Sequence, residues 1–295
     1  MSTLCIVGCG NLGTAILESL FRSPSEEASS VSIKKFVACV RGERSERRLS
    51  ERFHSSENRL EISKGDNVRA IKGSDIILLG VDPADVDETL REPGFADALA
   101  GKLLISIVAG RTRGQIETVL SENSSDKESK VWVVRTLPNI AATVSQSITA
   151  IEKPDPGLPA HYLEITDAIL SCIGKTVHLS PNTMDAFTAV GGSTPAFFAV
   201  IVDALIDSAV AVGVPRHDAT AIIVQSMLGT ATLLQSGMHP GVLRDQGTSP
   251  EGCTIGGLMV LEETGVRGGL SRGLREAVTI ARLMGKDPHV NDTRH

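Results

Sequence analysis

"CIVGCGNLGTAI", residues 5–16, is the stretch that decides the fold of this 295-residue chain. An apolar, β-rich run ends at Gly8 and a helical run follows, so Gly8, Gly10 and Gly13 form a GxGxxG turn between a strand and a helix. Gly8 permits the tight turn, Gly10 lets the backbone approach a pyrophosphate, and Gly13 lets the helix pack closely on the strand. The pattern predicts a dinucleotide site with phosphate at the helix N-terminus.

Short β-rich runs alternate with helical stretches through the first half of the chain. This alternation predicts an α/β fold, a Rossmann-type parallel sheet with helices on both faces. The β-rich runs are TLCIVG, KKFVACV, DIILLGV, KLLISIVA, KVWVVRTL and, after a helix near 160–173, KTVHLS. Single helices are expected between them, one of them over 84–99. We expect this dinucleotide-binding domain to span residues 1–180.

After Ser180 no further β-rich run occurs, which predicts an all-helical domain over residues 181–295. The run AFFAVIVDALIDSAVAVG is apolar around most of its helical circumference, so a single small domain cannot bury it. A second subunit would cover it, and we therefore expect a homo-oligomer, at least a dimer. The apolar-periodic segments are roughly 183–212, 218–236, 239–245, 251–264 and 266–284.

Composition narrows the class of protein. The formal net charge is -6 with scattered basic residues, so we expect no nucleic-acid partner. The five cysteines show no CxxC spacing, which indicates thiols in a reducing compartment. No basic segment precedes the first apolar run, and Asp203 interrupts the long apolar run in the helical half. We expect a soluble cytoplasmic protein that does not bind a membrane.

The residues after the second strand choose between the nicotinamide cofactors. An acid there binds the ribose 2′-hydroxyl and repels a 2′-phosphate, but here Arg41 and Arg44 follow with no acid at the strand tip. We expect these two arginines to bind the 2′-phosphate of NADPH, with NADH as the alternative cofactor. The competing interpretation places Arg44, Arg47 and Arg48 on the solvated face of a charged helix.

Strong acids and bases are missing from the expected catalytic positions. No His, Lys or Tyr stands out as a catalytic candidate at a strand end or on the first long helix of the second domain, and the seven histidines lack metal-ligand spacing. No metal site is predicted. Asp203 and Asp207 share a helix face, and we interpret them as a solvated or subunit-contacting edge rather than a carboxylate pair.

The stretch LRDQGTSPEGCTIGGLMVLEE, residues 243–263, combines hydroxyls, glycines and a proline before an apolar-periodic segment. This pattern is typical of a helix N-terminus, whose free N–H groups bind a carboxylate. Ser249 and Thr254 add hydroxyls that can hydrogen-bond a ring nitrogen. Because the loop supplies no strong acid, its substrate should carry its own activation, as a protonated cyclic imine does. The alternative is a helix-capping loop without a ligand.

Together these segments resemble the pyrroline-5-carboxylate reductases, which reduce Δ1-pyrroline-5-carboxylate to proline with NAD(P)H. The resemblance covers nearly the whole chain, through IVGCGNLGTAI, GVDPADV, LLISIVAG, VRTLPNIAATV, GGSTPAFFAVIVDALIDSAVAVGVPR and the loop just described. It implies helical domains that interlock as dimers, with one subunit's loop completing the other's site.

The resemblance also implies roles for particular residues. Thr254 would hydrogen-bond the ring nitrogen, and Ser249 with the backbone of 249–254, including Gly252 and Cys253, would cradle the substrate carboxylate. Asn139 would lie near the nicotinamide ribose. The other cofactor contacts that it implies are Gly8, Gly10, Asn11, Leu12, Arg41, Val81 and Pro83.

The chain departs from the family pattern at several positions. Asp82 replaces a usual Lys, Gly247 a usual Val and Glu251 a usual Gly, and the run around Thr194 also differs. Glu251 brings a negative charge to a loop expected to bind a carboxylate, although in the first turn of a helix it would favour the helix. We therefore expect NADPH-dependent reduction of pyrroline-5-carboxylate to L-proline in proline biosynthesis. The alternatives are reduction of a related modified cyclic imine in a tailoring pathway, or a non-catalytic NADP(H)-binding regulator.

Overall fold

A computed structural model describes residues 2–22, 33–56, 58–126, 128–154 and 156–284. The chain divides into two compact units, each described by itself below: unit 1 comprises residues 1–192 and 278–295, and unit 2 comprises residues 193–277. This division falls later than the boundary predicted after residue 180. The difference arises because the first helix after that boundary packs its Met184 and Phe187 against the sheet of unit 1.

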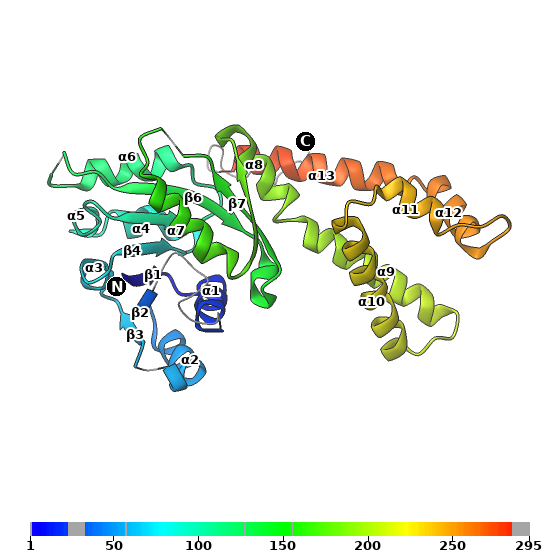
Figure 1. Ribbon diagram of the computed structural model, residues 1–295, viewed down its shortest axis with the longest axis horizontal. Coiled ribbons are helices and arrows are strands. Elements are labelled where there is room, and N and C mark those ends of the chain that lie inside the picture. Colours follow the sequence, from blue (N-terminus) through cyan, green and yellow to red (C-terminus); the bar gives the residue numbers. More distant parts are fainter. Residues whose placement is uncertain (1, 23–32, 57, 127, 155, 285–295) are drawn as a thin grey trace. The chain divides into compact units, whose positions relative to one another are not determined.

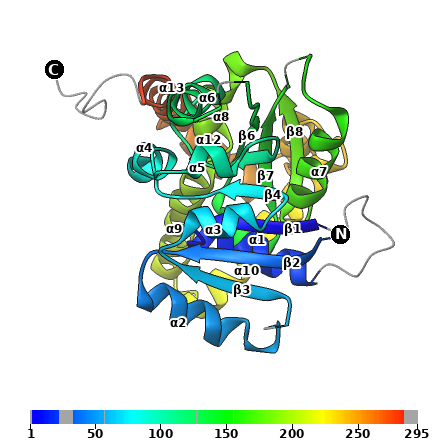
Figure 2. The same cartoon turned by 90° about the vertical axis from the view of Figure 1, so that its left-hand side faces the viewer.

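Unit 1 is built on one eight-stranded sheet in the order β3-β2-β1-β4-β5-β6-β7-β8 (Figures 1 and 2). Every neighbouring pair is parallel except β6 and β7, which are antiparallel. The Rossmann-type prediction is confirmed. The strands are β1 (Ser2–Val7), β2 (Ile33–Val40), β3 (Leu60–Lys64), β4 (Ile76–Leu79), β5 (Leu103–Ser106), β6 (Trp132–Pro138), β7 (Ser147–Glu152) and β8 (Gly174–Leu179).

Two strands, β3 and β7, were not predicted from the sequence. β3 lies at the edge of the sheet and is only half-buried, so its sequence LEISK carries no continuous apolar run. β7 is mostly buried but reads SITAIE, because it mixes small, hydroxyl and acidic side chains. Because β7 was not predicted, its antiparallel pairing with β6 was not predicted either. Central β1, by contrast, is buried on both faces and reads as an unbroken apolar run.

Helices cover both faces of the sheet, as predicted. Leu4 and Ile6 of β1 point into one hydrophobic layer, and Cys5 and Val7 point into the other. The first layer contains α1 (Asn11–Arg22), α2 (Glu43–Arg52) and α7 (Ala160–Ser171). The second contains α3 (Asn67–Lys72), α4 (Val86–Leu90), α5 (Phe95–Ala98) and α6 (Arg113–Asn123).

Short 3-10 turns complete unit 1 and correct one prediction. They are η1 (His54–Ser56), η2 (Pro83–Asp85) and η3 (Ile140–Val144). The single helix predicted over 84–99 is wrong, because the region divides into η2, α4 and α5. Pro93 and the left-handed Gly94, with a φ of 81°, separate the last two.

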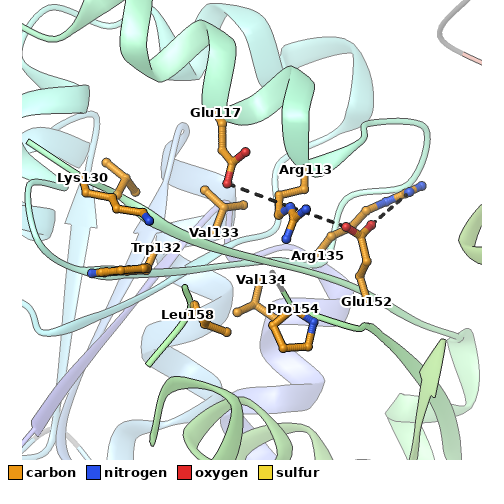
Figure 3. A pocket seen from close by; sticks show the side chains of 11 residues that line it. Arg113, Glu117, Lys130, Trp132, Val133, Val134, Arg135, Glu152, Pro154 and Leu158 are labelled. Atoms are coloured by element: carbon orange, nitrogen blue, oxygen red, sulfur yellow. Dashed lines mark ion pairs between the residues drawn. The ribbon is translucent and has the colours of Figure 1, made fainter. Parts of the chain in front are cut away.

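A buried network of ion pairs ties β6 and β7 to their neighbouring helices (Figure 3). The Arg135 side chain of β6 is 2% exposed, and its Nη2 lies 3.0 Å from Oδ1 of Asp185 on α8 (Pro181–Val190). Its Nη1 lies 3.6 Å from Oε2 of Glu152, whose Oε1 lies 3.5 Å from Nε of Arg113. Arg113 also pairs with the more exposed Glu117, whose Oε1 lies 4.0 Å from Arg113 Nε. The two most buried members, Arg135 and Glu152, carry opposite charges that offset each other.

The described residues after Ser180 form helices joined by turns and contain no strand, as predicted. The helices are α9 (Thr194–Ala211), α10 (Arg216–Gln235), α11 (Pro240–Gln246), α12 (Cys253–Glu263) and α13 (Val266–Leu283), the last of which ends in unit 1. The single helix predicted over 183–212 is instead α8 and α9. Gly191 and Gly192 separate them: a Cβ on Gly192 would lie 2.4 Å from the Thr188 carbonyl oxygen, so only glycine fits this break.

Unit 2 leaves much apolar surface uncovered within one chain. Ile206 is the buried residue of α9, and Ala219 is that of α10. Val200 is 71% exposed and Val212 is 81% exposed, although α9 packs along α10. Apolar side chains in such numbers require a covering surface, which agrees with the expected second subunit.

Replacing Arg135 should destabilise the fold strongly. Arg135→Met leaves Glu152, 5% exposed, and Asp185 without their shared cation, at a cost of about 3 kcal/mol or more. Denaturant unfolding at fixed protein concentration measures the change. Arg91→Met is the matched control: it removes an exposed pair, 3.7 Å from Glu122, and should cost less than about 1 kcal/mol. Equal losses in the two variants would contradict a buried network.

Candidate active site

The glycine turn forms one wall of a cavity of about 410 Å³ in unit 1. The cavity lies at the carboxyl ends of β1, β2 and β4, where the strand order reverses on either side of β1. Open α/β sheets bind ligands at this position. The lining residues are Val7, Gly8, Cys9, Gly10, Asn11, Leu12, Cys39, Val40, Arg41, Ser45, Asn67, Gly80, Val81, Asp82, Asp85 and Thr89.

Each glycine of the turn has a distinct environment. Gly8 has a φ of +83°, and a Cβ there would lie 2.6 Å from the Val81 backbone nitrogen. A Cβ on Gly13 would lie 3.0 Å from Cγ2 of Ile6, so helix and strand do pack closely. Nothing lies within 4 Å of the Cβ position of Gly10, whose face is open to the cavity. The tight turn and the close packing are therefore present, and the approach of Gly10 to a pyrophosphate stays a prediction.

Helix α1 presents free donors at this cavity. The Thr14 N–H donates to the Gly10 carbonyl at 2.9 Å, whereas the N–H groups of residues 11–13 have no partner among the described residues. Such donors, at the positive end of the helix dipole, favour an anion. Burial raises the pKa of the neighbouring Cys9 to about 12, so this thiol stays neutral and adds no negative charge to the site.

Arg48 of α2 holds the turn in place. Its Nη2 donates to the Cys9 carbonyl and its Nη1 donates to Asn11 Oδ1, both at 3.2 Å. The interpretation of Arg48 as part of a solvated helix face is wrong. Sequence reasoning missed its role because the contact depends on how α2 docks beside α1, which no local pattern reveals.

The predicted phosphate ligands differ in their placement. Arg41 lines the cavity and its Nη1 lies 2.8 Å from Oδ2 of Asp85, whereas Arg44 is exposed and does not line it. Ser45 lines the cavity and was not predicted. Pro83 begins η2 and is also outside the lining, while Asp82 caps η2 by accepting from the Ala84 N–H at 3.0 Å.

Asn139 has a structural environment at the end of β6. Its Oδ1 accepts from the Ala141 N–H at 3.2 Å, and its Nδ2 donates to the Gly191 carbonyl at 2.8 Å. Its backbone N–H donates to Ser147 Oγ at 3.1 Å. These bonds secure the end of α8 to the sheet, and Asn139 does not line the cavity. Its predicted place near the nicotinamide ribose stays a prediction.

The second group of candidate residues surrounds the N-terminus of α12 in unit 2. Gly252 is the N-cap of this helix and makes no side-chain cap, and the Gly256 N–H makes the first backbone bond, to the Gly252 carbonyl at 3.3 Å. The N–H groups of residues 253–255 have no partner among the described residues. The 11-residue helix therefore presents a free anion site at the predicted position.

Two hydroxyls of the loop are also unoccupied, whereas that of Thr248 donates to the Asp245 carbonyl at 2.8 Å. Thr254 and Ser249 are exposed, and neither hydroxyl has a hydrogen-bond partner among the described residues. Helical Thr220, by comparison, donates to the carbonyl four residues earlier at 2.8 Å. A Cβ on Gly252 would lie 2.5 Å from Ser249 Oγ, so glycine at 252 allows this hydroxyl to lie beside the helix start. Cys253, the first residue of α12, is exposed.

Glu251 adopts a glycine-like backbone conformation. Its φ of 60° lies in the left-handed region, which costs a residue with a Cβ about 1 kcal/mol. The helix predicted to start at 251 starts at Cys253, so Glu251 precedes the N-cap and is not in the first helical turn. The predicted position of Glu251 in the first helical turn is therefore wrong, while a negatively charged residue beside the loop is present.

Asp207 of α9 forms an exposed ion pair. The Asp207 carboxylate pairs with Arg216 at 2.6 Å and is 60% exposed, in agreement with a solvated helix edge. Among the described residues, no group of three or more His, Cys, Asp or Glu side chains is placed to hold a metal ion.

Comparisons with known proteins match both parts of the chain. A model of the pyrroline-5-carboxylate reductase dimerisation family matches residues 181–284, and a model described as NADP oxidoreductase coenzyme F420-dependent matches residues 3–110. A pyrroline-5-carboxylate reductase of Lophium arboricola is 42% identical over 99% of this chain and 96% of its own length. One of Neurospora crassa is 38% identical over the same shares.

Solved structures share the fold. The crystal structure of Plasmodium falciparum pyrroline carboxylate reductase with NADP bound superposes with a TM-score of 0.79. That alignment covers 97% of this chain and 98% of the other at 21% identity. A likeness at 21% identity shows the fold alone. The family is shown by the sequence relatives.

Alanine substitutions should separate the two functions of the glycine turn. Gly10→Ala meets no atom, so it should leave the melting temperature unchanged while its methyl group weakens NADPH binding about tenfold. Gly8→Ala should lower the melting temperature because its Cβ meets the Val81 backbone. Thermal melts and NADPH titrations measure both, with exposed Gly114→Ala as control. If the Gly10→Ala protein binds NADPH as tightly as the wild type, the glycine turn is not part of the cofactor site.

Substitutions of Glu251 should report its backbone strain. Glu251→Gly accommodates a φ of 60° and Glu251→Ala does not, although both remove the carboxylate. The glycine variant should therefore be more stable than the alanine variant by up to about 1 kcal/mol. Denaturant unfolding of the two proteins side by side checks this, and a more stable alanine variant would refute the strained conformation.

Proposed function

The chain belongs to the pyrroline-5-carboxylate reductase family, and we propose that it reduces the cyclic imine Δ1-pyrroline-5-carboxylate to L-proline with NADPH, in proline biosynthesis. The observation that carries this proposal is the uncapped N-terminus of α12, with the unoccupied hydroxyls of Ser249 and Thr254 beside it. Free backbone N–H groups and two hydroxyls in one short loop match a substrate that has one carboxylate and one ring nitrogen.

The cavity of unit 1 supports NADPH as the cofactor. The free N–H groups of residues 11–13 suit a pyrophosphate, the missing side chain of Gly10 leaves room for it, and the Arg41 guanidinium suits a 2′-phosphate. Leu12 and Val81 add apolar walls. When bound, the cofactor supplies a hydride to the carbon of the C=N bond. NADH is the second cofactor that this site supports.

The loop of unit 2 supports binding and orientation of the imino acid. The backbone donors of residues 253–255 and Ser249 Oγ would hold the carboxylate, and Gly252 leaves that approach open. The Thr254 hydroxyl would accept a hydrogen bond from the protonated ring nitrogen. Because a protonated imine is already electrophilic, these residues need only hold it in position, and no strong acid is required. The lack of His and Lys in this loop is thus compatible with catalysis.

The helical part of the chain forms the homo-oligomer. Its apolar helices leave large side chains exposed, and the dimerisation family model covers residues 181–284. The stretch Pro181–Ala211, with a mean hydropathy of 1.7, could cross a membrane by length and composition alone. We assign it to subunit contact because α8 packs in unit 1 and the whole stretch lies within the dimerisation match. We further propose a cytoplasmic location. We also propose that residue 180 divides the dinucleotide-binding region from the region matched by the dimerisation family, although the first helix after it packs in unit 1.

Glu251 favours one alternative substrate class. Its carboxylate lies next to the N-cap of the helix whose N–H groups would bind the substrate carboxylate, so it weakens the attraction for an anion. A modified cyclic imine that is larger or carries a positive substituent would tolerate this charge better. The change of a usual Lys to Asp82 in the cofactor cavity adds a second departure.

Rates of NADPH oxidation with two ring sizes test the proposed substrate. The purified protein should prefer Δ1-pyrroline-5-carboxylate to its six-membered homologue by about tenfold or more in kcat/KM, since a misplaced ring loses orientation. A preference for the larger ring would favour the modified imine. NADPH binding without turnover of either imine would favour a regulator.

Thr254 should affect turnover more than cofactor binding. Thr254→Val removes the hydroxyl at nearly constant shape, and we expect kcat to fall about 10²-fold while NADPH affinity stays unchanged. Thr254→Ser should restore most of the rate. Thr264→Val is the matched control, because that hydroxyl already donates to the Val260 and Leu261 carbonyls. A Thr254→Val protein with full kcat would leave this residue without a chemical role.

A further inference from the structure

The tip of β2 lacks an acid in sequence, but the fold supplies one from another segment. Asp85, the last residue of η2, places Oδ2 2.8 Å from Nη1 of Arg41, which follows β2. Both residues line the cofactor cavity together with Ser45 and Asn11. The position at which dinucleotide-binding folds distinguish a ribose 2′-hydroxyl from a 2′-phosphate therefore holds both a cation and an anion.

The two side chains differ in how firmly they are held. The Arg41 side chain is 81% exposed at the end of a long flexible stem, whereas that of Asp85 is 26% exposed on a short one. The Asp85 N–H donates to the Asp82 carbonyl at 2.9 Å, and the Asp82 carboxylate caps the same turn through the Ala84 N–H at 3.0 Å. The fold thus fixes the acid, while Arg41 is free to change partner.

The opposite charges have opposite consequences for the two cofactors. A carboxylate accepts a hydrogen bond from the 2′-hydroxyl of NADH and repels the 2′-phosphate of NADPH, whereas a guanidinium attracts that phosphate. Arg41 also has to exchange the Asp85 carboxylate for the phosphate when NADPH binds. The second acid on this side of the cavity, Asp82, has one oxygen engaged by the Ala84 N–H.

We propose that Asp85 is the residue that sets cofactor preference, by giving NADH an acceptor and by competing with the 2′-phosphate for Arg41. This inference rests on the proposed function. It predicts a protein that binds both cofactors, with a smaller preference for NADPH than Arg41 alone would produce. The arginines at the tip of β2 favour NADPH, and Asp85 adds an acceptor for NADH at the same position.

Equilibrium titration of the purified full-length protein tests the proposal without any turnover. The ligands are NADPH, NADH and the fragments adenosine 2′,5′-bisphosphate and 5′-AMP, which isolate the 2′ position. Asp85→Asn should bind NADPH and the bisphosphate about threefold to tenfold more tightly and NADH more weakly, so the ratio of the two dissociation constants shifts by about tenfold or more. Arg41→Gln should shift the ratio in the opposite direction.

Asp87→Asn is the matched control. Asp87 forms an equivalent pair, with Oδ2 2.8 Å from Nη2 of Arg111, but neither residue lines the cofactor cavity. This variant should keep the wild-type ratio. An Asp85→Asn protein whose two affinities change by the same factor would overturn the proposal and reduce Asp85 to a positioning residue. A wild-type protein that binds neither cofactor would instead overturn the proposed function.

Discussion

The close approach of the Gly8 backbone to the end of β4 is the constraint on which the cofactor site depends. A side chain at Gly8 would meet the Val81 backbone at 2.6 Å, so the turn can pass over the sheet only as glycine. This path directs α1 so that its first N–H groups face the cavity, and Arg48 then secures the turn from α2. The buried strand β1 provides the rigid base, because it pairs on both sides and is covered on both faces.

Both candidate sites lie at the N-terminus of a helix that follows a glycine. In unit 1 Gly10 precedes α1, and in unit 2 Gly252 precedes α12, so neither helix has a side chain at its N-cap that would occupy the first N–H groups. Helix ends left uncapped in this way bind anions: a pyrophosphate in the first case and a carboxylate in the second. The chemistry that we propose needs little else from the protein, since the hydride comes from the cofactor and the electrophile is activated by its own protonation.

Local patterns in the sequence predicted the parts of this molecule that depend on local physics. The glycine spacing, the buried parallel strands and the apolar helices were predictable, because each follows from backbone geometry or periodicity within a few residues. Arg135, Arg48 and Asp85 were not, because their partners come from distant segments that only the folded sheet brings together. Edge strand β3 was missed because it is only partly buried and has no continuous apolar run. The left-handed backbone of Glu251 was not predicted because residues with a Cβ rarely adopt it.

Direct transfer of the hydride is the central claim of this account, and isotope labelling measures it. The protein would be incubated with Δ1-pyrroline-5-carboxylate and NADPH in which both hydrogens at the nicotinamide C4 position are deuterium, and the product would be analysed by mass spectrometry. The account predicts proline with one deuterium on the ring carbon that was double-bonded to nitrogen. Unlabelled proline, or no proline while the cofactor remains bound, would contradict it.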